Sequence, residues 1–374
     1  MAAGPLLVAS QTTDPFLVAL AALLQRLPWL LLGFVAGALA DRLDRRLLVA
    51  TVDLLRAGVL ALLCTSIATG VVSVPVVLAA MFLLGTAEVF ADSTSGTLLP
   101  MLVDRDDLAV ANARIQGGFL TVNQLVGPPI GAALFAAGAA WPFAAQTVLV
   151  ALGALLVLQI SLPATGREPA TTRLRQDIGE GFRWVLHHAA VRTLVLTIFV
   201  FNITFGAAWS VLVLWAAQRL HLGPVGYGLL TTVSALGGLL GTGAYGWITR
   251  RVSLGNIMRV GLVLETLTHL GLALTTTPWV AMAIFFVFGA HAFVWGTTSI
   301  TVRLRAVPSG LQGRVSSVNQ VGVYGSLVLG SALGGLIAQR WGVTAPFWFA
   351  FVGSAVFLVL IWPQLAHIAH DDEE

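Results

Sequence analysis

The sequence predicts an all-α polytopic membrane protein made of two six-helix bundles in a parallel pseudo-repeat. Three observations support this prediction. Hydrophobic residues make up 57% of the 374 positions and charged residues only 10%, with a mean hydropathy of +0.89. A soluble chain with so few charges could not cover its surface. Uncharged runs long enough to cross a bilayer recur along the chain, and glycine and arginine positions repeat between its halves.

Charges, proline and glycine turns, and punctuation such as "TTTP" divide the chain into eleven full spans after an apolar fragment at residues 2–10. Each span must be helical, because lipid offers no partner for backbone N–H and C=O groups. The segments are also too long and too apolar for barrel strands. The predicted spans are 15–40, 47–69, 75–98, 114–137, 141–162, 191–218, 225–248, 256–275, 279–301, 315–338 and 343–362. The fragment supplies about half of a span, so we expect an N-terminally truncated first helix, from an upstream start codon or a truncated gene.

Arginine placement predicts the orientation of the spans. Sixteen of the twenty arginines lie in five loops, whereas the opposite set of loops holds only Arg219 and Arg340. Since basic loops face the cytoplasm, we expect a multi-pass protein of the cell inner (plasma) membrane with a cytoplasmic C-terminus. The five basic loops are 41–46, 104–114, 164–192, 249–259 and 303–314.

An internal repeat predicts two halves of six spans each. Two separated patches agree on the period, at offsets of 204 and 203 residues. The matched positions are Gly33, Gly37 and Arg46 with Gly237, Gly241 and Arg250, and Leu108, Gly127 and Gly131 with Leu311, Gly330 and Gly334. An even number of spans per period makes the halves parallel, related by an axis along the membrane normal. The predicted domains are an N-terminal bundle (1–163), a cytoplasmic linker (164–190), a C-terminal bundle (191–366) and an acidic cytoplasmic tail (367–374).

The linker carries the one long polar stretch between the bundles, and its pattern predicts a short amphipathic helix. Apolar residues cluster on it against charged ones. The apolar set is Phe182, Trp184, Val185 and Leu186, and the charged set is Arg173, Arg175, Asp177 and Arg183.

The stretch "GALADRLDRR" ends the first full span in a cluster of charges. It resembles the signature that the major facilitator superfamily carries between its second and third helices, except that Asp44 stands where the family usually has glycine. The resemblance implies a gate whose charges contact the other bundle when the cytoplasmic side is closed. A cluster that only sets topology is the alternative. The gating motif is Gly33, Gly37, Asp41, Arg42, Arg45 and Arg46.

A second element, "NQLVGPPIGAAL", resembles the Gly-Pro motif in the fifth helix of exporter branches of that superfamily. Gly127, Pro128 and Gly131 remove side-chain volume and one backbone hydrogen bond, which predicts close packing and a bend. Asn123 stands where an exporter-type glycine is expected, so ordinary small-residue packing remains the alternative. The surrounding sequence resembles the branch of enterobactin-type siderophore exporters and macrolide efflux proteins, which include drug:proton antiporters.

Ionisable residues inside spans cost about 2.5–3.5 kcal/mol each at the bilayer midplane and therefore need a partner or a purpose. Glu88 and Asp92 lie one turn apart, and Arg26 lies at a similar depth. Burial and a nearby arginine shift a carboxyl pKa in opposite directions, so a carboxylate between both influences can load and release a proton. We predict Glu88 as the proton carrier and Asp92 as a second candidate for this role. Arg26 is predicted to be the partner that adjusts the pKa of Glu88. The alternative is a structural Arg26–Glu88 ion pair.

The resemblance also implies which helices line a central cavity, namely the first, fourth, seventh and tenth. The cavity and substrate candidates on them are Phe90, Asn202, Phe201, Phe205, Trp209, His291 and Trp295. These side chains suit an amphipathic substrate better than a sugar. Two further pairs, Asp53 with Arg56 and Glu265 with His269, are predicted to be structural. The fourth-helix arginine motif of many drug–proton antiporters is absent from the sequence.

No motif for soluble chemistry is evident, since the sequence has no Walker loop, no dinucleotide fingerprint and no metal-ligand spacing. We therefore expect no enzyme activity, no cofactor, no metal and no nucleic-acid partner. The leading hypothesis is a monomeric secondary transporter in the lipid bilayer, in which a proton gradient drives efflux of a small-molecule drug, macrolide or siderophore by alternating access. The alternatives are an uptake or facilitative carrier, a non-transporting membrane sensor or partner protein, and a truncated inactive transporter.

Overall fold

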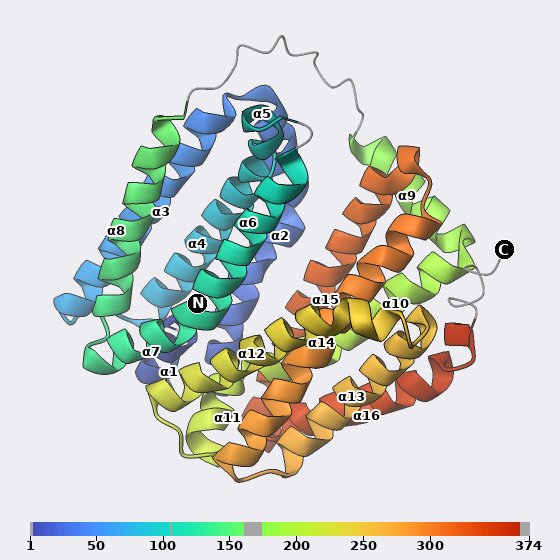
Figure 1. Ribbon diagram of the computed structural model, residues 1–374. Coiled ribbons are helices and arrows are strands. Elements are labelled where there is room, and N and C mark those ends of the chain that lie inside the picture. Colours follow the sequence, from blue (N-terminus) through green and yellow to red (C-terminus); the bar gives the residue numbers. More distant parts are fainter. Residues whose placement is uncertain (1–2, 105–106, 161–173, 367–374) are drawn as a thin grey trace. The chain divides into compact units, whose positions relative to one another are not determined.

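The computed structural model describes residues 3–104, 107–160 and 174–366, and no strand occurs among them (Figure 1). The predicted all-helical class is therefore confirmed. Ten helical segments of the described chain are long and apolar enough to cross a membrane, and one of them, Val110–Ala137, is a run of α- and π-helix. Ala345–Ile361 is a shorter apolar helix of 17 residues. The count of eleven full spans plus a partial one stays a prediction. The acidic tail, 367–374, lies outside the described residues.

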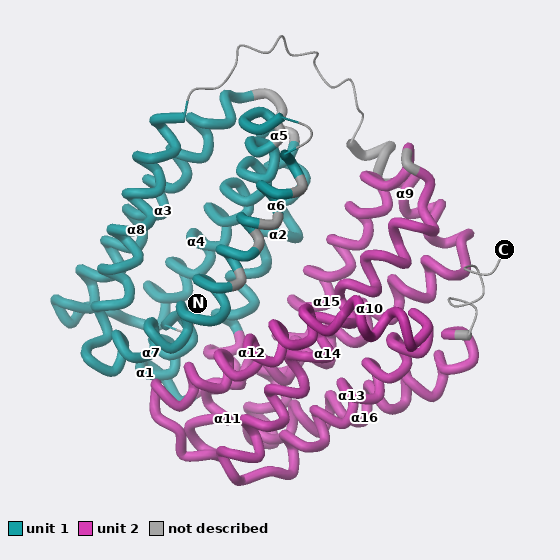
Figure 2. The backbone as a smooth tube through the Cα atoms, in the orientation of Figure 1, with its two compact units in different colours: residues 1–13, 20–172 teal, residues 14–19, 173–374 magenta. Residues whose placement is uncertain are grey.

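The chain divides into two compact units (Figure 2). Unit 1 comprises residues 1–13 and 20–172, and unit 2 comprises residues 14–19 and 173–374. In unit 1, α3 packs on α4 and α8, and α1 packs on α4 and α7. The elements up to residue 160 are α1 (Ala3–Gln11), α2 (Pro15–Arg42), α3 (Arg45–Ala68), α4 (Val74–Ser95), α5 (Leu99–Leu102), α6 (Leu108–Phe119), a π-helical segment (Leu120–Val126), α7 (Gly127–Ala137) and α8 (Trp141–Leu158).

In unit 2, α12 packs on α14, α10 packs on α15 and α16, and α13 packs on α14 and α16. Its helices are α9 (Leu174–His187), α10 (Ala189–Ser210), α11 (Leu212–Arg219), α12 (Pro224–Thr249), α13 (Leu254–Leu274), α14 (Pro278–Ala306), α15 (Gln312–Trp341) and α16 (Ala345–Ile361). Short 3₁₀ turns cover Ser309–Leu311 and Gln364–Ala366.

The predicted span at 191–218 is not one helix, because α10 ends at Ser210 and α11 begins at Leu212. Between them Val211 has φ −111° and ψ 9°, outside the α-helical region. The Ser210 hydroxyl donates to the Ala207 carbonyl oxygen at 2.9 Å. Such a bond from serine to the preceding turn competes with the regular helix pattern and often accompanies a bend.

The Gly-Pro motif follows the π-helical segment. The Gly127 N–H donates to the Val122 carbonyl, five residues earlier, and a Cβ at Gly127 would lie 2.8 Å from that same oxygen. Neither Pro128 nor Pro129 has an N–H to donate, which favours this wider turn. At the offset of 203 their counterparts are Ser331 and Ala332, which keep their N–H groups, and α15 is a continuous α-helix there.

The amphipathic helix of the linker, α9, packs on α15 in unit 2. Val185 is 4% exposed and belongs with Trp184 to an apolar cluster that includes Val315, and Glu180 pairs with Arg314 at 3.0 Å. The other two residues of the predicted apolar set, Phe182 and Leu186, are exposed. Phe182 and Leu186 lie four positions apart and therefore share one helix face. The predicted apolar set thus divides into a packed pair, Trp184 and Val185, and an exposed pair, Phe182 and Leu186.

Glycines of the repeat permit close helix contacts in unit 2. A Cβ on Gly237 or Gly241 of α12 would clash with carbonyl oxygens of α14, and a Cβ on Gly330 or Gly334 of α15 would clash with carbonyl oxygens of α10. Small residues at such positions let helix backbones approach each other where lipid gives no hydrophobic driving force. For Gly131, the repeat counterpart of Gly334, no described atom lies within 4 Å of the corresponding Cβ position.

This difference predicts the stability of two matched variants. Both Gly131→Ala and Gly334→Ala gain up to about 1 kcal/mol of helix propensity. Only Gly334→Ala forces a methyl group against the Ala207 carbonyl, which costs about 1–3 kcal/mol. We therefore expect a lower thermal unfolding midpoint for purified Gly334→Ala than for Gly131→Ala. Equal midpoints would show that the α10–α15 contact tolerates a side chain.

Candidate functional site

A cavity of about 220 Å³ lies among α10, α13 and α14 of unit 2, and it is called the aromatic cavity below. Its lining residues follow helical spacing on α10 and α14, so one face of each helix supplies them. Five sequence-predicted substrate candidates meet here. The lining is Ile198, Phe201, Asn202, Phe205, Gly261, Leu262, Glu265, Phe288, His291, Ala292 and Trp295.

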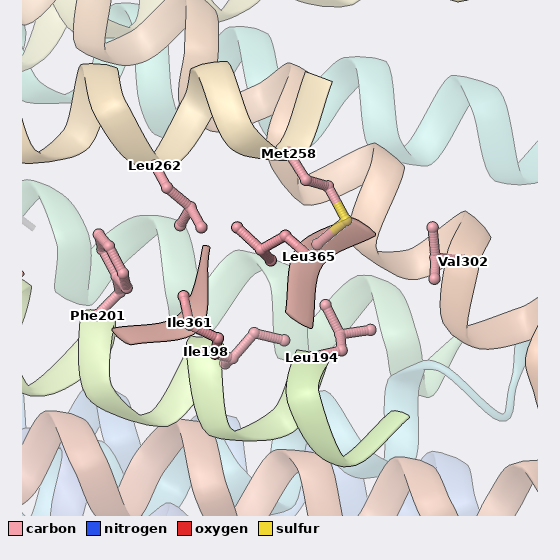
Figure 3. Packing of buried hydrophobic residues seen from close by; sticks show 8 residues of the cluster. All are labelled: Leu194, Ile198, Phe201, Met258, Leu262, Val302, Ile361 and Leu365. Atoms are coloured by element: carbon pink, nitrogen blue, oxygen red, sulfur yellow. The ribbon is translucent and has the colours of Figure 1, made fainter. Parts of the chain in front are cut away.

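A buried apolar cluster holds the walls of this cavity together (Figure 3). It joins α10, α13, α14, α16 and the 3₁₀ turn after α16 through Leu194, Ile198, Phe201, Met258, Leu262, Val302, Ile361 and Leu365. Three of these residues, Ile198, Phe201 and Leu262, also line the cavity. Dense packing restricts the rotamers of these three lining residues.

Aromatic rings continue along one side of the aromatic cavity. Phe205 stacks on Trp209 at a centroid distance of 4.4 Å and lies 5.9 Å from Phe288. Phe288 in turn meets His291 edge-on at 5.4 Å. Trp209 is not a lining residue, but it packs against the lining rings of Phe205 and Phe288. On α13, a Cβ at Gly261 would lie 2.6 Å from Cδ1 of Trp295, so the absence of a side chain there lets this indole lie against the helix.

Glu265 supplies the carboxylate of the aromatic cavity, and its side chain is only 13% exposed. His291 Nε2 lies 3.4 Å from Glu265 Oε2, and His269 Nε2 lies 3.9 Å from Oε1. The sequence interpretation paired Glu265 with His269 alone, on a peripheral helix. The structure corrects it, because α13 packs against α14 and thereby brings Glu265 to His291 and into the cavity wall. A sequence signal existed, since Gly261, Leu262 and Glu265 share one helix face.

Unit 1 contains a second group of charged residues on its spans, called the acidic cluster, formed by the partly buried Asp53, Arg56 and Glu88 and the exposed Asp92. Arg56 on α3 interacts electrostatically with all three carboxylates. The predicted Asp53–Arg56 pair is therefore incomplete, because α4 adds two carboxylates to it. The predicted pairing of Glu88 with Arg26 stays a prediction.

A small cavity of about 50 Å³ lies beside the acidic cluster and is called the polar cavity. Four polar side chains from α2, α3, α4 and α8 line it, together with apolar residues. The polar set is Gln25, Arg56, Glu88 and Gln146. A site of this size with several polar partners suits one or more ordered water molecules. The candidate Phe90 lies on α4 and is half-buried, and it lines neither this cavity nor the aromatic one.

The described part of the gating motif binds the ends of neighbouring helices in unit 1. Arg45 donates to the carbonyl oxygens of Ala40 at 3.2 Å and Thr97 at 3.1 Å, and Arg46 donates to that of Ile160 at 3.1 Å. These carbonyls lie at or just beyond the C-terminal ends of α2, α4 and α8, where cations are favoured. The side chains of Asp41 and Arg42 lie outside what the structure describes. The Asp44 carboxylate caps α3 by accepting from the Leu47 N–H at 3.1 Å.

Several known proteins resemble this chain. A family model described as transmembrane secretion effector matches residues 2–372. The uncharacterized MFS-type transporter YkuC of Bacillus subtilis (strain 168) is 24% identical over 372 residues, which cover 95% of this chain and 85% of YkuC. The multidrug efflux pump Tap of Mycolicibacterium fortuitum is 28% identical over 372 residues, which cover 92% of this chain and 86% of Tap.

Solved structures share the fold. A bacterial homologue of the iron transporter ferroportin, in an inward-facing state, matches with a TM-score of 0.76 at 14% identity, covering 98% of this chain and 93% of that chain. The nucleoside transporter NupG matches with a TM-score of 0.75 at 12% identity, covering 97% and 94%. At such low identity these likenesses show the fold alone.

The contacts of Arg45 predict a structural contribution from the gating motif. Arg45→Ala removes two charge-assisted bonds to helix-end carbonyls, each worth about 1.5–3 kcal/mol. We expect a clearly lower thermal unfolding midpoint for Arg45→Ala, and a smaller decrease for Arg45→Lys, which keeps the charge but not the planar fork. Wild-type midpoints for both variants would contradict the assigned contacts.

Proposed function

Because this chain belongs to the transmembrane secretion effector family of major facilitator superfamily transporters, we propose that it is a proton-coupled exporter of a small amphipathic molecule. It is a multi-pass membrane transporter, and its family and relatives are transporters, not enzymes. Proton coupling, outward direction and the substrate class of drug, macrolide or siderophore belong to the proposal. We also propose the inner membrane as its location, a cytoplasmic C-terminus and a monomeric state.

The aromatic cavity is the observation that carries the substrate proposal. Ligand sites are typically concave and mostly apolar, with a few polar groups that orient the ligand. Here aromatic and aliphatic side chains form most of the lining, and Asn202, Glu265 and His291 supply the polar groups. An amphipathic molecule matches this division better than a sugar, whose hydroxyl groups would lack partners. The similarity to the multidrug efflux pump Tap supports the outward direction.

The acidic cluster and the polar cavity support proton coupling through Glu88. Glu88 lines a cavity of water-sized dimensions and interacts with both Arg56 and Asp92. A proton relay inside a membrane needs a carboxylate, a neighbour that shifts its affinity for protons, and a route for water. Glu88 is the carboxylate, Arg56 and Asp92 are its charged neighbours, and the polar cavity offers space for water beside it. Loading and release of this proton would bias the alternation between inward-open and outward-open states.

The proton proposal predicts the behaviour of Glu88→Gln. The amide fills the same space, so we expect a folded protein whose export of a fluorescent drug from proteoliposomes no longer responds to an imposed pH gradient. Glu180→Gln is the matched control, because this carboxylate is half exposed on α9 and far in sequence from the acidic cluster. If Glu88→Gln keeps the wild-type response, the proton carrier lies elsewhere.

A folding failure of Glu88→Gln also has a defined interpretation. If Arg56→Met on the same background restored the folded protein, Glu88 and Arg56 would form a purely structural pair. Proton release upon addition of substrate to the wild-type protein separates the remaining functions. Its absence across drug and siderophore panels would favour a non-transporting sensor, and exchange without a pH change would favour a facilitative carrier.

The gate proposal predicts the behaviour of Asp41→Ala. Removing this carboxylate should shift the population toward the state open to the cytoplasm and lower turnover more than substrate affinity. Labelling of Asn202→Cys in a Cys64→Ala background, by a membrane-impermeant maleimide from the cytoplasmic side, measures that population. Asp44→Ala is the control, since it removes a nearby charge that caps α3. Unchanged labelling in Asp41→Ala would leave the motif as a topology signal only.

A further inference from the structure

The wall of the aromatic cavity carries an acidic side chain and no arginine or lysine to neutralise it. Among its lining residues Glu265 is the one carboxylate, and none is an arginine or a lysine. A carboxylate at this depth is costly unless a cation or hydrogen-bond donors compensate it. The residues within ion-pair distance of Glu265 in the described chain are two imidazoles, His269 and His291.

Neither imidazole satisfies Glu265 well. Their nitrogens lie 3.9 and 3.4 Å from the carboxylate oxygens, whereas a charge-assisted hydrogen bond measures about 2.7–2.9 Å. Both ring nitrogens of His291 and the Nε2 of His269 are buried without a hydrogen-bond partner among the described atoms. The carboxylate, in contrast, reaches the cavity surface. The site therefore presents an acceptor whose resident partners hold it only loosely.

The rings around Glu265 favour an organic cation. Phe201, Phe205, Phe288 and Trp295 line the same cavity, and aromatic faces attract cations by about 0.5–2 kcal/mol. They also exclude water, which strengthens the attraction to the carboxylate. An inorganic cation suits the site poorly, because no group of three or more His, Cys, Asp or Glu among the described residues could hold a metal ion.

We infer that Glu265 binds the cationic nitrogen of an amphipathic base, with Phe205, Phe288 and Trp295 enclosing its apolar body. His291 holds the carboxylate in the empty cavity and gives way to the ligand. This inference deepens the proposed function and rests on it for the statement that the ligand is transported. Within the proposed substrate class it selects amines and quaternary ammonium compounds and excludes anionic molecules.

Binding of two isosteric probes tests the inference. Phenyltrimethylammonium and tert-butylbenzene have nearly the same shape, and only the first is charged, at every pH. Their affinities for the purified full-length protein in detergent are measured by calorimetry, with protein-free micelles subtracted. We expect the cation to bind at least about tenfold more tightly than the neutral probe. Equal affinities in the wild-type protein would overturn the inference, and this comparison needs no variant.

Two matched variants test whether the carboxylate of Glu265 is responsible for the preference for the charged probe. Glu265→Gln should weaken binding of phenyltrimethylammonium about tenfold or more and leave tert-butylbenzene unchanged. Glu180→Gln should leave both affinities unchanged, because this carboxylate is half exposed on α9 and lines neither the aromatic nor the polar cavity. Unaltered cation affinity in Glu265→Gln, or an equal loss in Glu180→Gln, would overturn the inference. The calorimetric measurement detects binding and does not require transport. A failure of the export experiments would therefore refute the proposed function without affecting the conclusion about cation binding at Glu265.

Discussion

The absence of water in the bilayer is the constraint on which this structure depends, because every backbone polar group in a span must find its partner within the protein. Helices meet this requirement with hydrogen bonds inside each segment. Several side-chain hydroxyl groups in the spans also donate to a backbone carbonyl of their own helix. Thr197, Thr266 and Thr298 each donate to the carbonyl oxygen four residues earlier, at 2.7 to 2.9 Å. These three hydroxyl groups are thus satisfied on their own helix, which leaves the adjoining helix surface free to pack.

Packing in lipid then depends on shape, since apolar surface gains nothing by leaving an apolar solvent. Gly237, Gly241, Gly330 and Gly334 let pairs of helices touch through their backbones in unit 2. These close contacts fix the rotation of each helix about its own axis. The rotation of α10 and α14 turns Phe205 and Trp295 toward one cavity, whose wall α13 completes with Glu265.

The acidic cluster of unit 1 and the Glu265 site of unit 2 differ in their counter-ions, and this difference suits different roles. In unit 1, Arg56 is a permanent cation among three carboxylates beside a small polar cavity. In unit 2, imidazoles are the only groups within ion-pair distance of Glu265 in the described part of the chain, and its carboxylate lines the aromatic cavity. The guanidinium of Arg56 already pairs electrostatically with the carboxylates of unit 1. A proton can compete with it for these carboxylates, whereas a larger cation would find no place beside it. Loosely held imidazoles leave room for a larger cation from outside.

The sequence alone determined the helical class and the positions of most of the long apolar helices, because hydropathy and backbone satisfaction in lipid are properties of each segment by itself. It also identified Phe201, Asn202, Phe205, His291 and Trp295, which the structure brings together in one cavity. Only the tertiary structure joined Glu265 to His291 and added Glu88 and Asp92 to the Arg56 pair. The break between α10 and α11 likewise came from the structure. These contacts depend on which faces of distant helices meet, and helix rotation is set by packing between segments, which no local pattern contains.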